Sequence, residues 1–285
     1  MKHYAIMLWL AMSIMVISCN KHDHVPFPKD ARQVTEALKG GYPLRFQYNS
    51  QRLLTQLSMQ FNPGIGPNVF FTYDQQKRPI RETDSASGYY NQYIYLGGKL
   101  VRVEKYTNLA GFLGQTSFTY DNRGRIIQKV GDATYYDYAN YEYYGNSQNV
   151  KRTSYFDGSP TGTAASKGTL TAPTARASVI EEYTYDNKIN PYSTIGNFPV
   201  IPFWVSDYWI LVKYDPIPEN NILTQKFYGR TDSTYFKFQE YSFTYGYDGK
   251  YPVTLNSSRT LFNPDGSPGW TENKTGGYTY DKLSW

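Results

Sequence analysis

Histidine and cysteine are almost missing from this chain of 285 residues. The three histidines, His3, His22 and His24, all lie near its start, and the single cysteine is Cys19. Serine and cysteine hydrolases need an imidazole as general base, and protein zinc sites are built mainly from histidine and cysteine. The rest of the chain therefore excludes these classes of enzyme, and we expect it to hold no metal and no cofactor.

Long apolar runs and clusters of one charge are also missing beyond the first 18 residues. The mean hydropathy is −0.60, which argues against a further membrane span. The net charge is +5, but lysine and arginine are scattered and form no basic stripe. We therefore expect no nucleic-acid partner.

Residues 1–18 have the pattern of a secretory signal, with Lys2 before an apolar stretch that is too short to span a bilayer. They lead into Ser18-Cys19, and this junction resembles the lipobox of bacterial lipoproteins. The resemblance implies that Cys19 is lipidated and that its acyl chains, such as palmitate, anchor the protein in a membrane. A plain secretory signal is the alternative. We interpret residues 19–29 as a flexible tether.

The residue after the lipobox cysteine is Asn20 and not aspartate. In Gram-negative lipoproteins of this kind, the resemblance favours the outer membrane over retention in the inner membrane. The short run after the cysteine holds a single acid, Asp23, so surface display and the periplasmic leaflet both remain open.

Tyrosine is abundant, with 30 residues beside 15 Phe and 5 Trp, and it recurs in pairs with aspartate. The clearest copy spans residues 117–126 and contains Tyr120-Asp121. Other copies, at first about 24 residues apart, have their tyrosines at 48, 73, 95, 144, 185, 214, 247 and 280. A unit of this size holds two strands and two turns, which predicts a meander of antiparallel hairpins.

The turn after each tyrosine explains the aspartate. Asp121 is the residue type favoured at the first position of a type I turn, and Gly124 suits the positive φ that follows. On the preceding strand, Phe118 and Tyr120 face the same side because side chains alternate. We therefore predict that the repeat tyrosines stack in columns on one face of the sheet.

Nine such units predict an all-β fold of about 16–18 strands over residues 30–285. A sheet that wide curls or closes because strand twist accumulates, so we expect an antiparallel meander rolled into an open or closed barrel. The sequence offers one helix candidate, residues 31–38, capped by Asp30 and ended by Gly40-Gly41.

The motif Tyr120-Asp121-Asn122-Arg123-Gly124-Arg125-Ile126 resembles the YD repeat of Rhs-like proteins. Together with the lipobox, the chain is similar to a group of small YD-like bacterial lipoproteins of unknown function. That resemblance covers roughly residues 44–281 and implies a porin-like β-sheet. It implies nothing about a reaction.

A membrane-spanning pore is a poor interpretation of the same pattern, although the chain ends on the aromatic Trp285. Charged residues such as Arg102 and Glu104 are predicted on the outer face of a strand. Lipid-facing positions tolerate such charges only at a cost of about 2–4 kcal/mol near the midplane. We expect the lipid anchor to be the contact with the membrane.

Two insertions interrupt the repeat. Residues 157–178 are rich in small and polar residues and predict a mobile loop. Residues 191–218 contain five prolines and cannot form a regular central strand. This second insertion is either a plug inside the barrel or an aromatic platform at its rim. On the platform interpretation the candidate ligand-binding residues are Phe203, Trp204, Tyr208 and Trp209.

The sequence indicates a non-catalytic binding or structural module of the cell envelope, with a glycan or another envelope protein as partner. The alternative is a glycan-acting enzyme that uses a pair of carboxyls. Glu181 and Glu182 cannot form that pair, because neighbours on a strand point to opposite faces. Asp-Ser motifs resemble an O-glycosylation signal and make Ser85 and Ser233 candidate modification sites.

Overall fold

A computed structural model describes residues 32–39, 42–61, 64–131, 138–156, 177–202, 214–232 and 234–281. Contacts divide the chain into Met1–Ala31 and a larger compact unit, Arg32–Trp285, and all described residues belong to the second. Among them no helix is long and apolar enough to cross a membrane.

The described residues form sixteen strands and one short 3₁₀ helix, η1 (Pro191–Thr194). The strands are β1 (Val34–Lys39), β2 (Tyr42–Tyr48), β3 (Leu54–Phe61), β4 (Gly64–Tyr73), β5 (Pro79–Asp84), β6 (Tyr89–Leu96), β7 (Lys99–Thr107), β8 (Gly111–Tyr120), β9 (Ile126–Val130), β10 (Tyr138–Tyr143), β11 (Val150–Phe156), β12 (Ala177–Ile189), β13 (Asn220–Thr231), β14 (Thr234–Asp248), β15 (Tyr251–Phe262) and β16 (Pro268–Tyr280).

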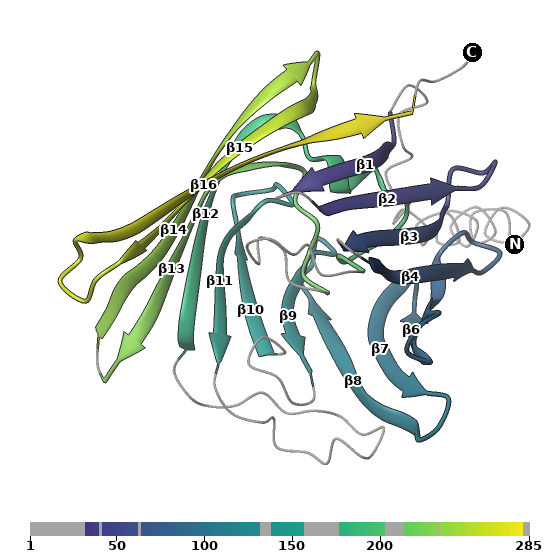
Figure 1. Ribbon diagram of the computed structural model, residues 1–285. Coiled ribbons are helices and arrows are strands. Elements are labelled where there is room, and N and C mark those ends of the chain that lie inside the picture. Colours follow the sequence, from purple (N-terminus) through teal and green to yellow (C-terminus); the bar gives the residue numbers. More distant parts are fainter. Residues whose placement is uncertain are drawn as a thin grey trace, which may run out of the picture. The chain divides into compact units, whose positions relative to one another are not determined.

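Each strand pairs antiparallel with its neighbours in sequence, and β1 pairs with β16, so the sheet closes into a barrel (Figure 1). The predicted all-β antiparallel meander is therefore confirmed, with its strand number at the lower end of the expected range. The sixteen strands form eight successive hairpins, from β1–β2 to β15–β16. Closure removes the free sheet edges that would otherwise expose unpaired backbone groups.

The predicted helix over residues 31–38 is wrong, because Val34–Lys39 form strand β1. This strand pairs with β16 on one side and with β2 on the other, and its Val34 and Ala37 are fully buried. A helix of eight residues is marginal by itself in water. Pairing with two neighbouring strands satisfies the backbone of β1 on both sides, and this outweighs a weak local preference for helix.

The tyrosine column is confirmed and is more regular than expected. In seven of the eight hairpins, a tyrosine near the end of the second strand donates its hydroxyl to a backbone carbonyl near the start of the first strand. For example, Tyr120 donates to Leu100 O and Tyr73 to Leu54 O, both at 2.7 Å. The other donors are Tyr48, Tyr143, Tyr185, Tyr245 and Tyr280. All seven rings pack against the barrel core, so they share the inner face.

Three of the nine tyrosines predicted to belong to the column do not belong to it. The column uses Tyr143 instead of Tyr144 and Tyr245 instead of Tyr247, and Tyr214 lies in the second insertion. Two adjacent or alternate tyrosines cannot be told apart by spacing alone. A shift in register at or beside the column tyrosine, as between Glu142 and Tyr143, changes which residue faces inward.

The turn chemistry is confirmed at the best copy of the repeat. The carboxylate of Asp121 accepts from the backbone N–H groups of Arg123 and Arg125, each at 2.9 Å, and Gly124 has φ of 79°. The side chain of Arg125 adds an ion pair with Asp121 at 2.8 Å and lies 4.5 Å from the ring centroid of Tyr143. This turn is thereby tied to the column tyrosine of the next hairpin, and Arg78, which pairs with Asp74, lies in the same way over Tyr95.

The column provides a matched pair of test substitutions. Tyr120→Phe removes the partner of Leu100 O and should cost about 1 kcal/mol of unfolding free energy. Tyr95 holds the equivalent place in the hairpin β5–β6, but its hydroxyl is buried without a hydrogen-bond partner. Tyr95→Phe should therefore be neutral or stabilising. Urea unfolding of the two variants checks this, and equal losses would contradict the role given to the hydroxyl.

The two ends of the barrel differ. At the tyrosine end, where the second strand of each hairpin finishes, the described chain begins and stops: Gln33 N donates to Asp281 Oδ1 at 2.7 Å. The opposite end carries the turns within hairpins, and we call it the hairpin end. Strands β12 to β16 have 12 to 15 residues whereas β9 has five and β10 six. In Figure 1 the long strands β13–β16 extend beyond their neighbours at the hairpin end.

Candidate functional site in the barrel interior

The second insertion, between β12 and β13, turns into the barrel. It starts with η1, and its described parts are residues 191–202 and 214–218. The two parts run side by side, because Ile201 N donates to Asp215 O at 2.9 Å and Tyr214 N to Ile201 O at 2.7 Å. We call these two parts the plug.

Aromatic packing holds the plug against the inner wall. Tyr192 lies between Phe46 of β2 and Tyr278 of β16, with ring centroids 6.5 and 6.2 Å away. Phe198 makes an edge-to-face contact with Phe71 of β4 at 5.1 Å. Both plug residues are buried. The described parts of the insertion are thus core, which agrees with the plug alternative.

A buried ion pair attaches the plug to the wall. Asp215 accepts from Lys129 Nζ of β9 at 2.6 Å, from Tyr141 Oη of β10 at 2.6 Å and from Tyr155 Oη of β11 at 3.1 Å. The side chains of Lys129 and Asp215 are 1% and 9% exposed. A charge this deeply buried is tolerated only when it is paired and hydrogen-bonded, as it is here.

The neighbouring plug residue is attached to a different part of the wall. Tyr214 Oη donates to Glu82 of β5 at 3.5 Å. Glu82 also accepts from the side chains of Asn91 and Tyr93 on β6. Consecutive residues of the plug, 214 and 215, therefore bind to strands that are far apart around the barrel.

A second buried carboxyl, Glu181 of β12, lies near this ion pair. It is 1% exposed and accepts from Tyr183 Oη and, at 2.9 Å, from Gln225 Nε2. Burial raises the pKa of Glu181 to about 8, and the charge of Asp215 adds to the increase, whereas the two hydrogen bonds and Lys129 oppose it. Glu181 is thus mainly protonated at pH 7.

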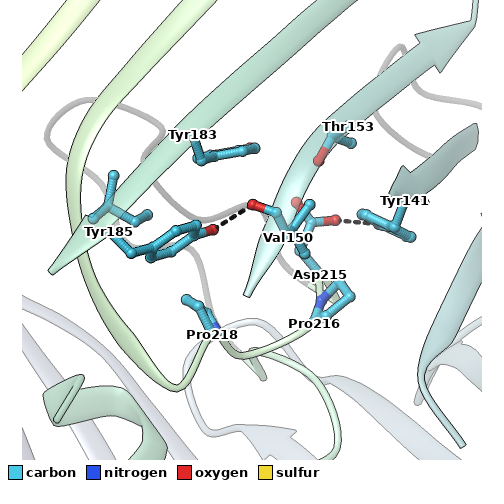
Figure 2. A pocket seen from close by; sticks show the side chains of 9 residues that line it. Tyr141, Val150, Thr153, Tyr183, Tyr185, Asp215, Pro216 and Pro218 are labelled. Carbon is cyan, nitrogen blue, oxygen red and sulfur yellow. Dashed lines mark hydrogen bonds between the residues drawn. The ribbon is translucent and has the colours of Figure 1, made fainter. Parts of the chain in front are cut away.

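A small pocket lies between the plug and β10–β13 (Figure 2). It is lined by Tyr141, Val150, Thr153, Tyr183, Tyr185, Asp215, Pro216, Pro218 and Ile222, and its cavity volume is about 20 Å³. Figure 2 shows the carboxylate of Asp215 facing Tyr141, and the hydroxyl of Tyr185 bound to Val150. Pockets for drug-sized ligands have about 300–1,000 Å³. This pocket is at the size of water or a very small molecule.

The polar groups of the interior hold the plug against the barrel wall. The negative charge of Asp215 is neutralised by Lys129, and Glu82 and Glu181 accept from tyrosine and amide donors, although Oε1 of Glu181 is buried without a hydrogen-bond partner. No group of three or more histidine, cysteine or acidic side chains among the described residues could hold a metal ion. The arrangement stabilises the position of the plug.

The structure tests few of the predicted site residues. Phe203, Trp204, Tyr208 and Trp209 lie outside the described residues, as do Cys19, Ser233 and residues 157–176 of the first insertion. Ser85 is exposed in the turn between β5 and β6 at the hairpin end, and its modification stays a prediction. Glu181 is buried whereas Glu182 is exposed, which confirms that these neighbours face opposite sides.

Sequence reasoning missed the pair Lys129–Asp215. Tyr214-Asp215 was interpreted as a loose copy of the repeat turn, and Lys129 lies in an ordinary strand pattern. A usable signal was present in Pro216, since proline cannot donate to a ladder and so argues against a turn leading to a central strand.

The fold has relatives among solved structures. A porin-like protein from Bacteroides uniformis is 14% identical over 87% of this chain and 96% of its own, with a TM-score of 0.51. A porin-like protein from Bacteroides vulgatus is 12% identical over 88% of this chain and 100% of its own, with a TM-score of 0.37. No family model and no curated protein matches. The similarity to the first of these structures shows the fold alone.

Proposed function

We propose that this chain is a lipid-anchored protein of the outer membrane, on its periplasmic leaflet or at the cell surface, and that it acts as a non-catalytic module that binds glycan. The proposal that the protein is not an enzyme is supported by the way its inner acidic groups are used to hold the plug. Inward-facing acids at its level, such as Glu82, Glu181 and Asp215, are buried and engaged by lysine, tyrosine or amide groups.

The outer face supports an anchor at the N terminus over a barrel in lipid. Glu182 of β12, Lys226 of β13 and Glu240 of β14 are direct cross-strand partners in one row. Their chain neighbours Glu181, Phe227 and Tyr241 are buried inside, so alternation directs the row outward. Charges at lipid-facing positions are costly. A tether at Cys19 places no such demand on the outer wall.

The enzyme alternative needs two carboxyls facing each other across an open cleft, about 5–9 Å apart. Glu181 has the raised pKa of a general acid, but it is 1% exposed and the pocket beside it is too small for a sugar ring. A purely structural envelope component is the remaining alternative, and it would bind no glycan.

Labelling and binding test the proposal. In cells fed labelled palmitate, the full-length chain should carry the label and fractionate with the outer membrane, and Cys19→Ala should lose both. The purified full-length chain should bind members of a glycan array without releasing products from them. An unlabelled wild type would overturn the anchor, hydrolysis would favour the enzyme, and an array without binding would favour the structural alternative.

A further inference from the structure

The inner wall of the long strands carries a half-exposed tryptophan, Trp270 of β16, which is 49% exposed. Trp270 is directly opposite Leu261 of β15. The same row of cross-strand partners continues to Gln239 of β14 and Phe227 of β13. Phe227 is part of the buried core, and cross-strand partners share a face. Trp270 therefore points into the barrel, at the hairpin end.

An arginine is positioned beside this ring. The guanidinium carbon of Arg259, on β15, lies 5.9 Å from the ring centroid of Trp270 and 5.9 Å from that of Tyr241. Gln239 Oε1 accepts from Arg259 Nε at 3.3 Å and from Nη2 at 2.9 Å. These bonds fix the plane of the guanidinium, a group whose remaining N–H donors suit carboxylates.

The charge of this wall is positive. Arg259 faces Glu272 directly across β15 and β16, and Glu272 also pairs with Lys274 at 3.4 Å. The side chains of Glu272 and Lys274 are each 30% exposed. Two cations therefore accompany one anion next to an accessible aromatic ring.

The outer face of the same hairpin is different. Its cross-strand pairs are Thr260 with Thr271 and Ser258 with Asn273, which are small and uncharged. Trp270 and the ionic side chains of Arg259 and Glu272 thus lie on the inner face of this hairpin. An exposed tryptophan ring offers a flat apolar face on which a sugar ring can stack, and the planar polar groups beside it can bind the substituents of that sugar.

We propose that the inner wall formed by Gln239, Tyr241, Arg259, Trp270, Glu272 and Lys274, here the Trp270 wall, binds a glycan that carries a carboxylate, such as a uronic acid polymer. Trp270 stacks on one sugar ring and the guanidinium of Arg259 binds the carboxylate of that ring or its neighbour. This inference rests on the proposed function: it specifies that the glycan is acidic and that it binds at the Trp270 wall.

Binding of trigalacturonate and of its methyl-esterified form to the full-length chain tests the proposal. The wild type should bind trigalacturonate more tightly than the ester, which lacks the charge. Trp270→Ala should weaken binding of both by at least about tenfold, as expected for a lost stacking contact. Arg259→Gln should weaken binding of trigalacturonate about tenfold or more and remove the preference over the ester.

Tyr89→Ala is the matched control, since Tyr89 is 53% exposed at the hairpin end but on a different strand, β6. It should bind like the wild type. Unchanged binding in the Trp270 and Arg259 variants, with unfolding midpoints like that of the wild type, would overturn this site and leave the proposed function standing. A wild type that prefers the ester would overturn the acidic class. If trigalacturonate, its methyl ester and all members of the glycan array fail to bind, both this site and the proposed function are wrong.

Discussion

Replacing Asp215 with asparagine should lower the free energy of unfolding by roughly 3–5 kcal/mol, because Lys129 would be left charged and buried without its counterion. The loss should be visible in urea or guanidinium unfolding at pH 7. It should also raise the rate at which amides of the plug exchange, because Asp215 attaches the plug to β9, β10 and β11.

Two controls separate the ion pair from its surroundings. The double substitution Lys129→Met with Asp215→Asn removes both charges and should recover most of the loss, since breaking a buried pair costs more than replacing it. Glu36→Gln removes one partner of the exposed pair Arg45–Glu36, whose side chains are 56% and 37% exposed, and should cost less than about 1 kcal/mol. A double variant as unstable as Asp215→Asn would contradict the charge argument.

The second large effect is a dependence of stability on pH. The pKa of Glu181 is raised from 4.5 to about 8 by burial, so the folded state holds a proton that the unfolded state releases. The stabilisation is complete below pH 4.5 and is lost as pH rises to about 8. The difference between these two pKa values corresponds to roughly 5 kcal/mol.

Glu181→Gln is the test, because glutamine stays neutral over the whole range. Relative to this variant, the wild type should lose stability between pH 4.5 and 8 with a slope of up to about 1.4 kcal/mol per pH unit. Glu182→Gln is the control: Glu182 is the exposed neighbour on the same strand, and its removal should leave the slope unchanged. Parallel stability curves for the wild type and Glu181→Gln would show that Glu181 titrates normally.

Local patterns predicted the parts of the fold that depend on residues near one another. The alternation around Tyr120, the aspartate at Asp121 and the glycine at Gly124 specify a strand, a turn and the start of the next strand. The near-regular recurrence of this unit predicts neighbouring hairpins without knowledge of any distant contact. The wrong tyrosine was assigned to the column where two tyrosines lie close together in sequence, because a shift of one residue in register moves a side chain to the other face.

The Trp270 wall was not predicted. Trp270 belongs to a strand that alternates like many others, and nothing near it in sequence points to Arg259 or Gln239. These three side chains meet because β14, β15 and β16 are neighbours in a register that the whole sheet determines. The tract at residues 203–209 attracted the binding prediction because its aromatic residues are consecutive in sequence.

By itself, the sequence determined that this protein is a meander of tyrosine-rich hairpins, because strand alternation and turn chemistry act within about 25 residues. Only the tertiary structure decided that Val34–Lys39 close the barrel as a strand and that Asp215 meets Lys129 in its interior. Both depend on groups far apart in the chain. Their free energies come from satisfying a sheet edge and a buried charge, and these needs exist only once the barrel has formed.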